Sequence, residues 1–344
     1  MTRRRLIGPP TSGRSFLAAL CTVVAAVSSC GHDAAGETDG GTPDTGGGGS
    51  PEAGSSDGGR LGVWPSSPTL FCTDGRQPVS PCPTPGQPAF GQDGNFPKRN
   101  PAYTVAAGAV ADSLTGLEWQ QAASGAMTWV EGTDACRMVR LGGHDDWRLP
   151  NRLELLSLVD YGRFDPAGDD GAFPDAVGMF WSSSQESTNV WVVEFADGKP
   201  FPSAKDSLQR ARCVRGAPRD AEFERSSDAA TTLDRSTGLR WTHTTTPIRQ
   251  SWLVVLAACR GSLSGRTDWR VPTIKELATL LSAGADGPAW LAIPGALWSA
   301  TPSARYSTAQ EDGWPAAWRF DGRFPELGVA MMSGESSVTC VRSE

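Results

Sequence analysis

Histidine and clustered basic residues are scarce in this chain. Its 344 residues include three histidines, and the formal net charge is −7. An acidic chain with no basic cluster beyond its first residues lacks the surface on which nucleic-acid binding depends. Only His144 and His243 fall in the part expected to fold, so a three-histidine iron site is excluded there. We therefore expect no cofactor, no metal site and no nucleic-acid partner.

Long apolar stretches are also rare. The one apolar run, residues 16–27, follows a group of arginines and ends at Val27-Ser28-Ser29-Cys30. It is too short to cross a bilayer of about 30 Å but has the length of a secretory signal. The small residues before Cys30 resemble the bacterial lipoprotein signal, although an ordinary secretory signal with a fortuitous cysteine is the alternative. We expect residues 1–29 to be a signal peptide, Cys30 to be lipidated, and the protein to be exported to the cell envelope or surface. The lipid would then be its only membrane attachment.

A low-complexity segment and a cysteine-bearing leader follow. Residues 30–63 are mostly Gly, Ser, Asp, Thr and Pro, and bury too little apolar surface to offset the entropy of ordering them. They predict a disordered tether with a reach of roughly 30 Å. The leader, residues 64–102, contains Cys72 and Cys82. No second Cys or His pair lies nearby to complete a zinc site, so this spacing favours a disulfide.

An internal repeat is the strongest signal in the sequence. Asp-Ser-Leu-Thr-Gly-Leu-Glu-Trp at 112–119 returns as Asp-Arg-Ser-Thr-Gly-Leu-Arg-Trp at 234–241. Asp-Trp-Arg-Leu-Pro at 146–150 returns as Asp-Trp-Arg-Val-Pro at 268–272. Further matched segments keep the same order, which is the mark of two tandem domains of one kind. We predict them at residues 103–217 and 226–344.

Each repeat predicts an α+β domain with two short helices followed by a small antiparallel sheet. Residues 127–140 and 251–261 have helical spacing, and Asn or Thr followed three residues later by Glu forms a capping box at Asn151 and Thr273. Short strands are expected at residues 180–183, 190–195 and 211–215.

The remaining cysteines recur with the repeat. Cys136 and Cys213 belong to the first unit, and Cys259 and Cys340 to the second. Six cysteines allow fifteen pairings. One bridge within each unit is the simplest arrangement that treats both units alike.

Together these motifs resemble the Lcl C-terminal domain family. The resemblance rests on Thr-Gly-Leu-x-Trp, a cysteine on a helix, Asp-Trp-Arg-Leu-Pro-x-x-x-Glu-Leu, Phe-Trp-Ser-Ser and a closing Arg-Cys-Val-Arg. The second repeat is degenerate, with Val271, Ala300 and Thr339 replacing Leu, Ser and Arg. The resemblance implies a C-type-lectin-like architecture and a role in adhesion or ligand binding. The family's founding adhesin binds sulfated glycans, but the acidic folded part of this chain does not favour them.

Several residues are candidates for a ligand surface. Asp146 with Arg148, and Asp268 with Arg270, form either a ligand site or a local charge-assisted pair that fixes the turn before the capped helix. Trp191 and Trp318 lie on late strands near polar turns and are the candidates for exposed rings on which a sugar stacks. Most of the other tryptophans are expected in the core.

The sequence offers two weaker candidates, a catalytic histidine and a calcium-binding loop. His144 sits beside Asp145 and Asp146, but no nucleophile turn accompanies it. The acidic residues of the loop at 165–175 could form a loose calcium site, or simply be solvated. These are Asp165, Asp169, Asp170 and Asp175.

We expect a non-enzymatic surface lipoprotein that binds an extracellular glycan or an envelope protein. One alternative is an enzyme like the formylglycine-generating group, whose Arg-Leu-Pro segment is similar. Such an enzyme would need a free thiol pair or a bound copper ion. The other is a purely structural envelope component.

Overall fold

The structure is a computed structural model that describes residues 62–68, 72–220, 222–227, 230–243, 246–261, 265–283, 295–304, 315–321 and 326–344. The predicted signal peptide, Cys30 and nearly all of the predicted tether lie outside these residues. Within the described ranges, no helix has the length and apolar character needed to cross a membrane. Both repeats and the leader fall in one compact unit, Asp57–Glu344.

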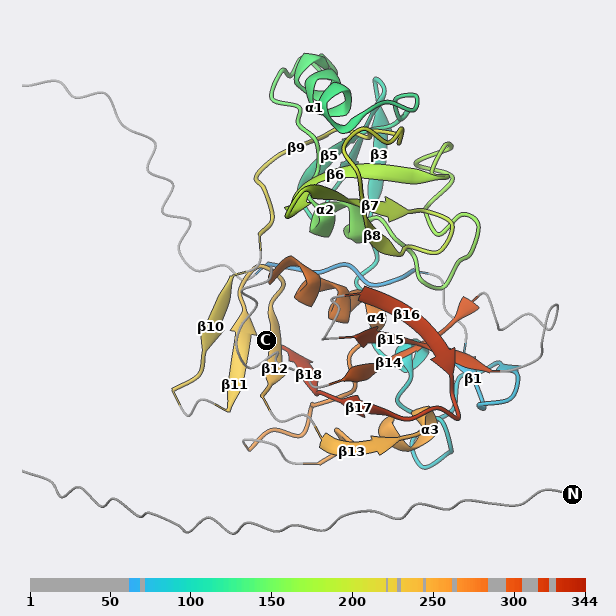
Figure 1. Ribbon diagram of the computed structural model, residues 1–344. Helices are drawn as coiled ribbons and strands as arrows, with labels where there is room; N and C mark the ends of the chain where they lie inside the picture. Colours follow the sequence, from blue (N-terminus) through green and yellow to red (C-terminus); the bar gives the residue numbers. More distant parts are fainter. Residues whose placement is uncertain are drawn as a thin grey trace, which may run out of the picture. The chain divides into compact units, whose positions relative to one another are not determined.

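The first repeat is α+β, as predicted, but strands precede its helices as well as following them (Figure 1). A four-stranded antiparallel sheet has the order β3-β4-β5-β9, and a three-stranded antiparallel sheet has the order β6-β7-β8. The helices follow β5 and precede β6 in sequence, and β9 returns to the first sheet. The elements are β3 Tyr103–Ala106, β4 Ala109–Asp112, β5 Leu117–Gln120, α1 Trp129–Met138, α2 Arg152–Ser157, β6 Met179–Glu186, β7 Asn189–Glu194, β8 Pro200–Ser203 and β9 Val214–Arg215.

In the described residues, the second repeat follows the same order with two additional strands and a 3₁₀ helix inserted, and its second sheet is larger. Its first sheet has the order β10-β11-β12-β18, and its second the order β13-β17-β14-β15-β16, in which β14 and β17 are parallel. The elements are β10 Phe223–Arg225, β11 Thr231–Asp234, β12 Leu239–Thr242, β13 Thr246–Gln250, α3 Trp252–Val255, α4 Ile274–Leu277, η2 Ala278–Ala283, β14 Ala296–Pro302, β15 Ala316–Asp321, β16 Glu326–Met331, β17 Ser336–Val338 and β18 Val341–Ser343.

Two predicted elements need correction, and one strand lies just before the predicted start of the second repeat. This strand, β10, ends one residue before residue 226 and pairs with β11 in the first sheet of that repeat. The helix expected over residues 251–261 is reduced to the four residues of α3, followed by turns. The closing strand expected over 211–215 is limited to β9, the two residues that pair with β5.

The leader packs on the second repeat, although it precedes the first in sequence. It contains β1 Cys72–Thr73, β2 Pro78–Val79 and the short 3₁₀ helix η1 Asp93–Asn95. Its Ala89 and Phe96 join the apolar cluster around Trp252 of the second repeat. A buried contact links Thr301 Oγ1 as donor to Asp93 Oδ2, at 2.8 Å.

The core has a shared centre and two separate wings. The central cluster contains residues of both repeats, among them Trp119 and Leu155 from the first and Trp241 and Ile274 from the second. Each wing surrounds one disulfide, Cys136–Cys213 or Cys259–Cys340, and the leader carries Cys72–Cys82. All three predicted pairings are confirmed. The repeats are therefore one folded unit with a common core, since neither alone buries the central cluster.

A buried lysine joins the two repeats. Lys275, on α4, donates to the carbonyl oxygens of Ser157 at 2.8 Å and Val159 at 2.6 Å, at the end of α2. Its ammonium thus lies where the carbonyl ends of a helix favour positive charge. Burial lowers its pKa to about 8 from 10.5, although nearby carboxylates oppose this.

We expect the two kinds of disulfide to differ in their effect on stability. Cys136 and Cys213 are 77 residues apart, so replacing both with alanine should lower the free energy of unfolding by about 4–5 kcal/mol in the chain-entropy model. Replacing Cys72 and Cys82, only 10 residues apart, should cost about 2–3 kcal/mol. Urea unfolding of both double variants measures the difference, and equal losses would contradict the interpretation.

Lys275 should make stability rise with pH in a mildly alkaline range. Because its pKa is about 8 in the folded chain and 10.5 when solvated, unfolding takes up a proton between these values. The free energy of unfolding should rise by about 2 kcal/mol from pH 8 to 10. Above pH 10 the effect reverses, because burial raises the pKa of Tyr103 and Tyr161 above 10.0.

The control is Lys275→Met, which fills the same space without a titrating group. Its stability should stay nearly level from pH 8 to 10 in urea unfolding. A rise in the variant equal to that of the natural chain would assign the effect to other groups.

Candidate functional site

The repeated Trp-Arg-Leu-Pro-x-x-x-Glu motif builds a buried ion pair in the first repeat. Arg148 binds Glu154 through two hydrogen bonds of 2.8 and 2.6 Å. Glu154 is fully buried and also accepts the backbone N–H of Asn151 at 2.8 Å, while the Asn151 side chain caps the N–H of Glu154. One carboxylate therefore closes the turn and caps α2, as the capping box predicts.

The second repeat forms the same arrangement. Arg270 binds Glu276 at 2.7 and 2.5 Å, and Thr273 replaces Asn151 as the capping residue. Although burial alone would raise it, the charge of Arg270 holds the pKa of Glu276 below its ordinary value. Both arginines thus serve the scaffold, which agrees with the structural alternative for them.

The expected pairing within each Asp-x-Arg segment is wrong, however. Asp146 bonds to Arg215 at 2.7 Å, and Asp268 pairs with Arg266 at 3.4 Å and Arg342 at 3.6 Å. Arg148 and Arg270 turn instead to the glutamates six residues ahead of them. In each repeat the arginine of this segment forms a β-bridge with the closing strand. The aspartate and the arginine, two residues apart, therefore pair with different side chains and not with each other.

Trp191 and Trp318 are also not the exposed rings that the sequence suggested. Only 7% of Trp191 and 3% of Trp318 is exposed. The Arg152 guanidinium covers the Trp191 ring at 4.1 Å, whereas Tyr161 packs against Trp318 edge-on at 5.2 Å. Trp191 lies on β7, between β6 and β8, and Trp318 lies on β15, between β14 and β16, so neighbouring elements cover both.

Carboxylates of the acidic loop over residues 165–175 are engaged within the protein. Asp169 accepts backbone N–H groups of its own loop, Asp170 pairs with Arg163, and Asp175 binds Arg210 and Arg212. In the described part of the chain no three His, Cys, Asp or Glu side chains are placed to hold a metal ion. His144 is exposed on its turn.

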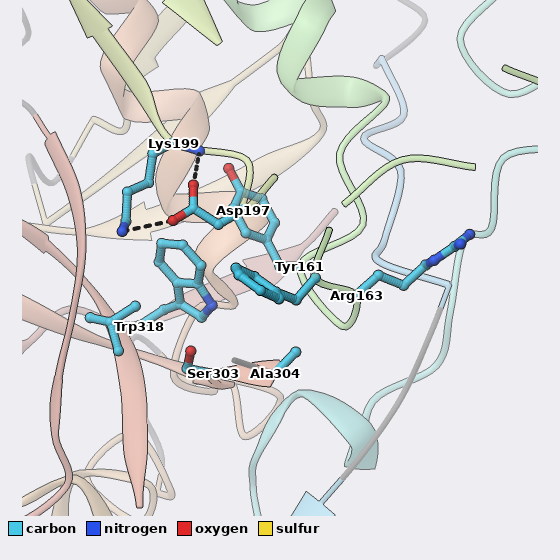
Figure 2. A pocket seen from close by; sticks show the side chains of 9 residues that line it. Tyr161, Arg163, Asp197, Lys199, Ser303, Ala304 and Trp318 are labelled. Atoms are coloured by element: carbon cyan, nitrogen blue, oxygen red, sulfur yellow. Dashed lines mark hydrogen bonds and ion pairs between the residues drawn. The ribbon is translucent and has the colours of Figure 1, made fainter. Parts of the chain in front are cut away.

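A pocket lies where loops of the first repeat meet the second sheet of the second repeat (Figure 2). It has about 260 Å³ of empty space, partly open to solvent, and its enclosed part is about the size of one water molecule. Of the candidate residues, Trp318 alone lines it. The lining residues are Tyr161, Arg163, Phe164, Asp197, Lys199, Ser303, Ala304, Trp318 and Val329.

Two buried polar groups at this pocket have no hydrogen-bond partner among the described residues. They are the indole N–H of Trp318 and the hydroxyl of Ser303, with residue exposures of 3% and 2%. A buried donor without a partner costs about 1–3 kcal/mol. Such groups in a native structure call for a water or a ligand group to complete them.

Charges at the rim are balanced. Lys199 Nζ pairs with Asp197 at 2.8 Å, an ion pair drawn in Figure 2, and it lies 5.6 Å from the Trp318 ring centre. Arg163 extends away from these side chains and pairs with Asp170. Tyr161 donates to the Gly198 carbonyl at 3.1 Å, and burial raises its pKa. The site thus offers aromatic surface and neutral donors.

Of the residues that line the pocket, the sequence analysis predicted only Trp318 as a candidate site residue. Tyr161 and Lys199 belong to the first repeat and Ser303 to the second, so no motif within one repeat joins them. The repeat comparison could have flagged them, because Tyr161 aligns with Ala283 and has no aromatic counterpart.

Comparison with known proteins identifies the repeat. A sequence model of the Lcl C-terminal domain matches twice in tandem, over residues 108–215 and 230–342. No curated protein matches the chain.

The Arg–Glu pair should govern stability while the exposed aspartate should not. Glu154→Gln leaves Arg148 without its counter-charge and should lower the free energy of unfolding by about 3 kcal/mol. Asp146→Asn, which alters a solvated pair, should leave the urea midpoint close to that of the natural chain. A larger loss in Asp146→Asn than in Glu154→Gln would reverse the assignment.

Proposed function

Because the chain belongs to the Lcl C-terminal domain family, we propose that it is a non-catalytic binding protein of the bacterial cell envelope. Its ligand is an extracellular glycan, which places a hydroxyl group in the pocket between the repeats. The observation that carries this proposal is the pair of buried, unpartnered polar groups on Trp318 and Ser303.

Sugar chemistry fits these groups. A sugar hydroxyl both donates and accepts hydrogen bonds. One such hydroxyl can therefore accept a hydrogen bond from the Trp318 indole N–H and form a second one with the Ser303 hydroxyl. Phe164, 44% exposed at the rim, offers apolar surface to the C–H face of a ring. Because Lys199 is already paired with Asp197, the site favours a neutral sugar over a sulfated one.

The expected location and architecture belong to the same proposal. The signal at residues 1–29, a lipidated Cys30 and a tether would hold the folded unit away from the membrane. Three disulfides suit an oxidising compartment outside the cytoplasm. The family resemblance supports a C-type-lectin-like fold for each repeat.

The cysteines favour binding over catalysis. An enzyme of the formylglycine-generating type would need a free thiol pair, and the six cysteines of the described ranges are all in disulfides. A purely structural envelope component would not need unpartnered groups in an open pocket.

The experiment is a glycan array with the disulfide-bonded chain, followed by titration of the bound sugar. Trp318→Phe keeps the ring but removes the indole N–H, and should weaken binding at least tenfold. Trp119→Phe is the matched control, because its indole N–H is also buried without a partner but lies in the core. It should bind as the natural chain does.

Two results would contradict the proposal. One is an array without a bound glycan, together with co-purification of a defined set of envelope proteins, which would favour the structural component. The other is a bound glycan whose affinity is equal in Trp318→Phe and the natural chain, which would move the site elsewhere.

A further inference from the structure

The leader occupies a defined face of the second repeat. Its contacts include three that use a carboxylate or an aromatic ring. Asp93 accepts from Thr301 Oγ1 at 2.8 Å, and two phenyl rings lie under arginines, Phe96 at 4.6 Å from Arg270 and Phe90 at 4.6 Å from Arg260. Arg260 also donates to the Phe90 carbonyl. In these contacts the leader presents one carboxylate, at the start of the single turn η1, and two aromatic rings.

The first repeat has the same frame around the equivalent face. Trp129 Nε1 donates to Ser182 O at 2.9 Å, as Trp252 Nε1 donates to Ser299 O at 2.7 Å. The next contact also matches. Ser184 Oγ accepts the N–H of Arg152 at 2.9 Å, as Thr301 Oγ1 accepts that of Ile274 at 2.9 Å. These matched bonds make Ser184 the counterpart of Thr301.

The residues that hold the leader have chemically similar counterparts in the first repeat. Ser184 corresponds to Thr301 and retains its hydroxyl group. Two arginines also correspond: Arg148 to Arg270, and Arg137, on α1, to Arg260. Beside them, Val130 replaces Leu253 as the apolar residue after the helix-borne tryptophan. We call Trp129, Val130, Arg137, Arg148 and Ser184 the open face.

Within the described chain, this face is less covered than its counterpart, although the Lys205 ammonium lies 4.8 Å from the Trp129 ring centre. Trp252 is fully buried, whereas Trp129 is half-buried. Val130 is 56% exposed and Leu253 38%. Thr301 is 3% exposed, and its hydroxyl donates a hydrogen bond to Asp93. Ser184 is half-buried, and no described side chain accepts a hydrogen bond from its hydroxyl. The Arg137 side chain is 70% exposed.

We propose that the open face binds a segment of a partner protein with the chemistry of the leader. The segment presents a carboxylate from a tight turn to Ser184 and aromatic rings to Arg137 and Arg148. It covers Val130 and the exposed edge of Trp129. This is a second site, separate from the pocket at Trp318 and independent of the glycan proposal.

A partner protein suits this face better than a second copy of the chain. Each copy has one leader, and that leader is already held on its own second repeat by the contacts above. Within it, Gln92 is fully buried and bonds to the backbone of Thr73, so releasing the leader would break a buried network. A second copy could supply the segment only by opening its own fold.

The test uses an oxidised synthetic peptide of residues 71–99, with Cys72 and Cys82 joined, labelled and titrated into the full disulfide-bonded chain. We expect saturable binding of one peptide per chain, measured by fluorescence anisotropy. Val130→Asp places a negative charge on the open face and should weaken binding at least tenfold. Val105→Asp, at a valine 46% exposed on β3, is the matched control and should bind normally.

A tethered form covers the case in which the free peptide does not fold. A second leader joined by a flexible linker after Glu344 should protect the amides of α1 from hydrogen exchange, and Val130→Asp should abolish that protection. Absence of binding in both forms, or binding unchanged by Val130→Asp, would overturn the proposal. So would concentration-dependent dimers of the natural chain that Val130→Asp abolishes, because the occupant would then be a second copy.

Discussion

The buried pair of arginine and glutamate beneath each capped helix is the constraint on which the rest depends. A carboxylate as buried as Glu154 is stable only with a counter-charge and filled lone pairs, and Arg148 with the Asn151 N–H supply both. Since Arg148 also bridges to Val214, the pair ties the turn, the helix start and the closing strand together. The adjoining disulfide then joins α1 to Cys213, the residue before that strand.

The two repeats share one core, and their sequences differ at positions where they contact each other. At the position of Leu153 in the first repeat, the second has Lys275, whose ammonium reaches the carbonyls ending α2. At the position of Trp191, covered within its own repeat by Arg152, the second has Trp318, covered by Tyr161 of the first. The pocket follows from this asymmetry, since its walls come from both repeats.

Buried polar groups without a hydrogen-bond partner occur both in the shared core and at the pocket. Trp119 and Trp241 leave the indole N–H unpartnered inside the shared core, where the apolar ring compensates for it. Trp318 and Ser303 do so among the residues that line the pocket. Burial alone therefore does not mark the candidate site; the position of the two groups in the pocket lining does. The open face is a different case, marked by comparison with the leader-covered face of the second repeat.

The sequence by itself determined the repeat, the family, the α+β class, the three disulfides and the capping boxes. These depend on local chemistry or on one motif recurring, which a linear pattern records. Only the tertiary structure decided that Arg148 pairs with Glu154 rather than Asp146, that Trp191 and Trp318 are buried, and that the leader rests on the second repeat. Each of these depends on which distant segments meet. Side-chain burial and ion pairing are set by the nearest neighbours in space, and between two similar repeats the sequence does not specify which copy supplies them.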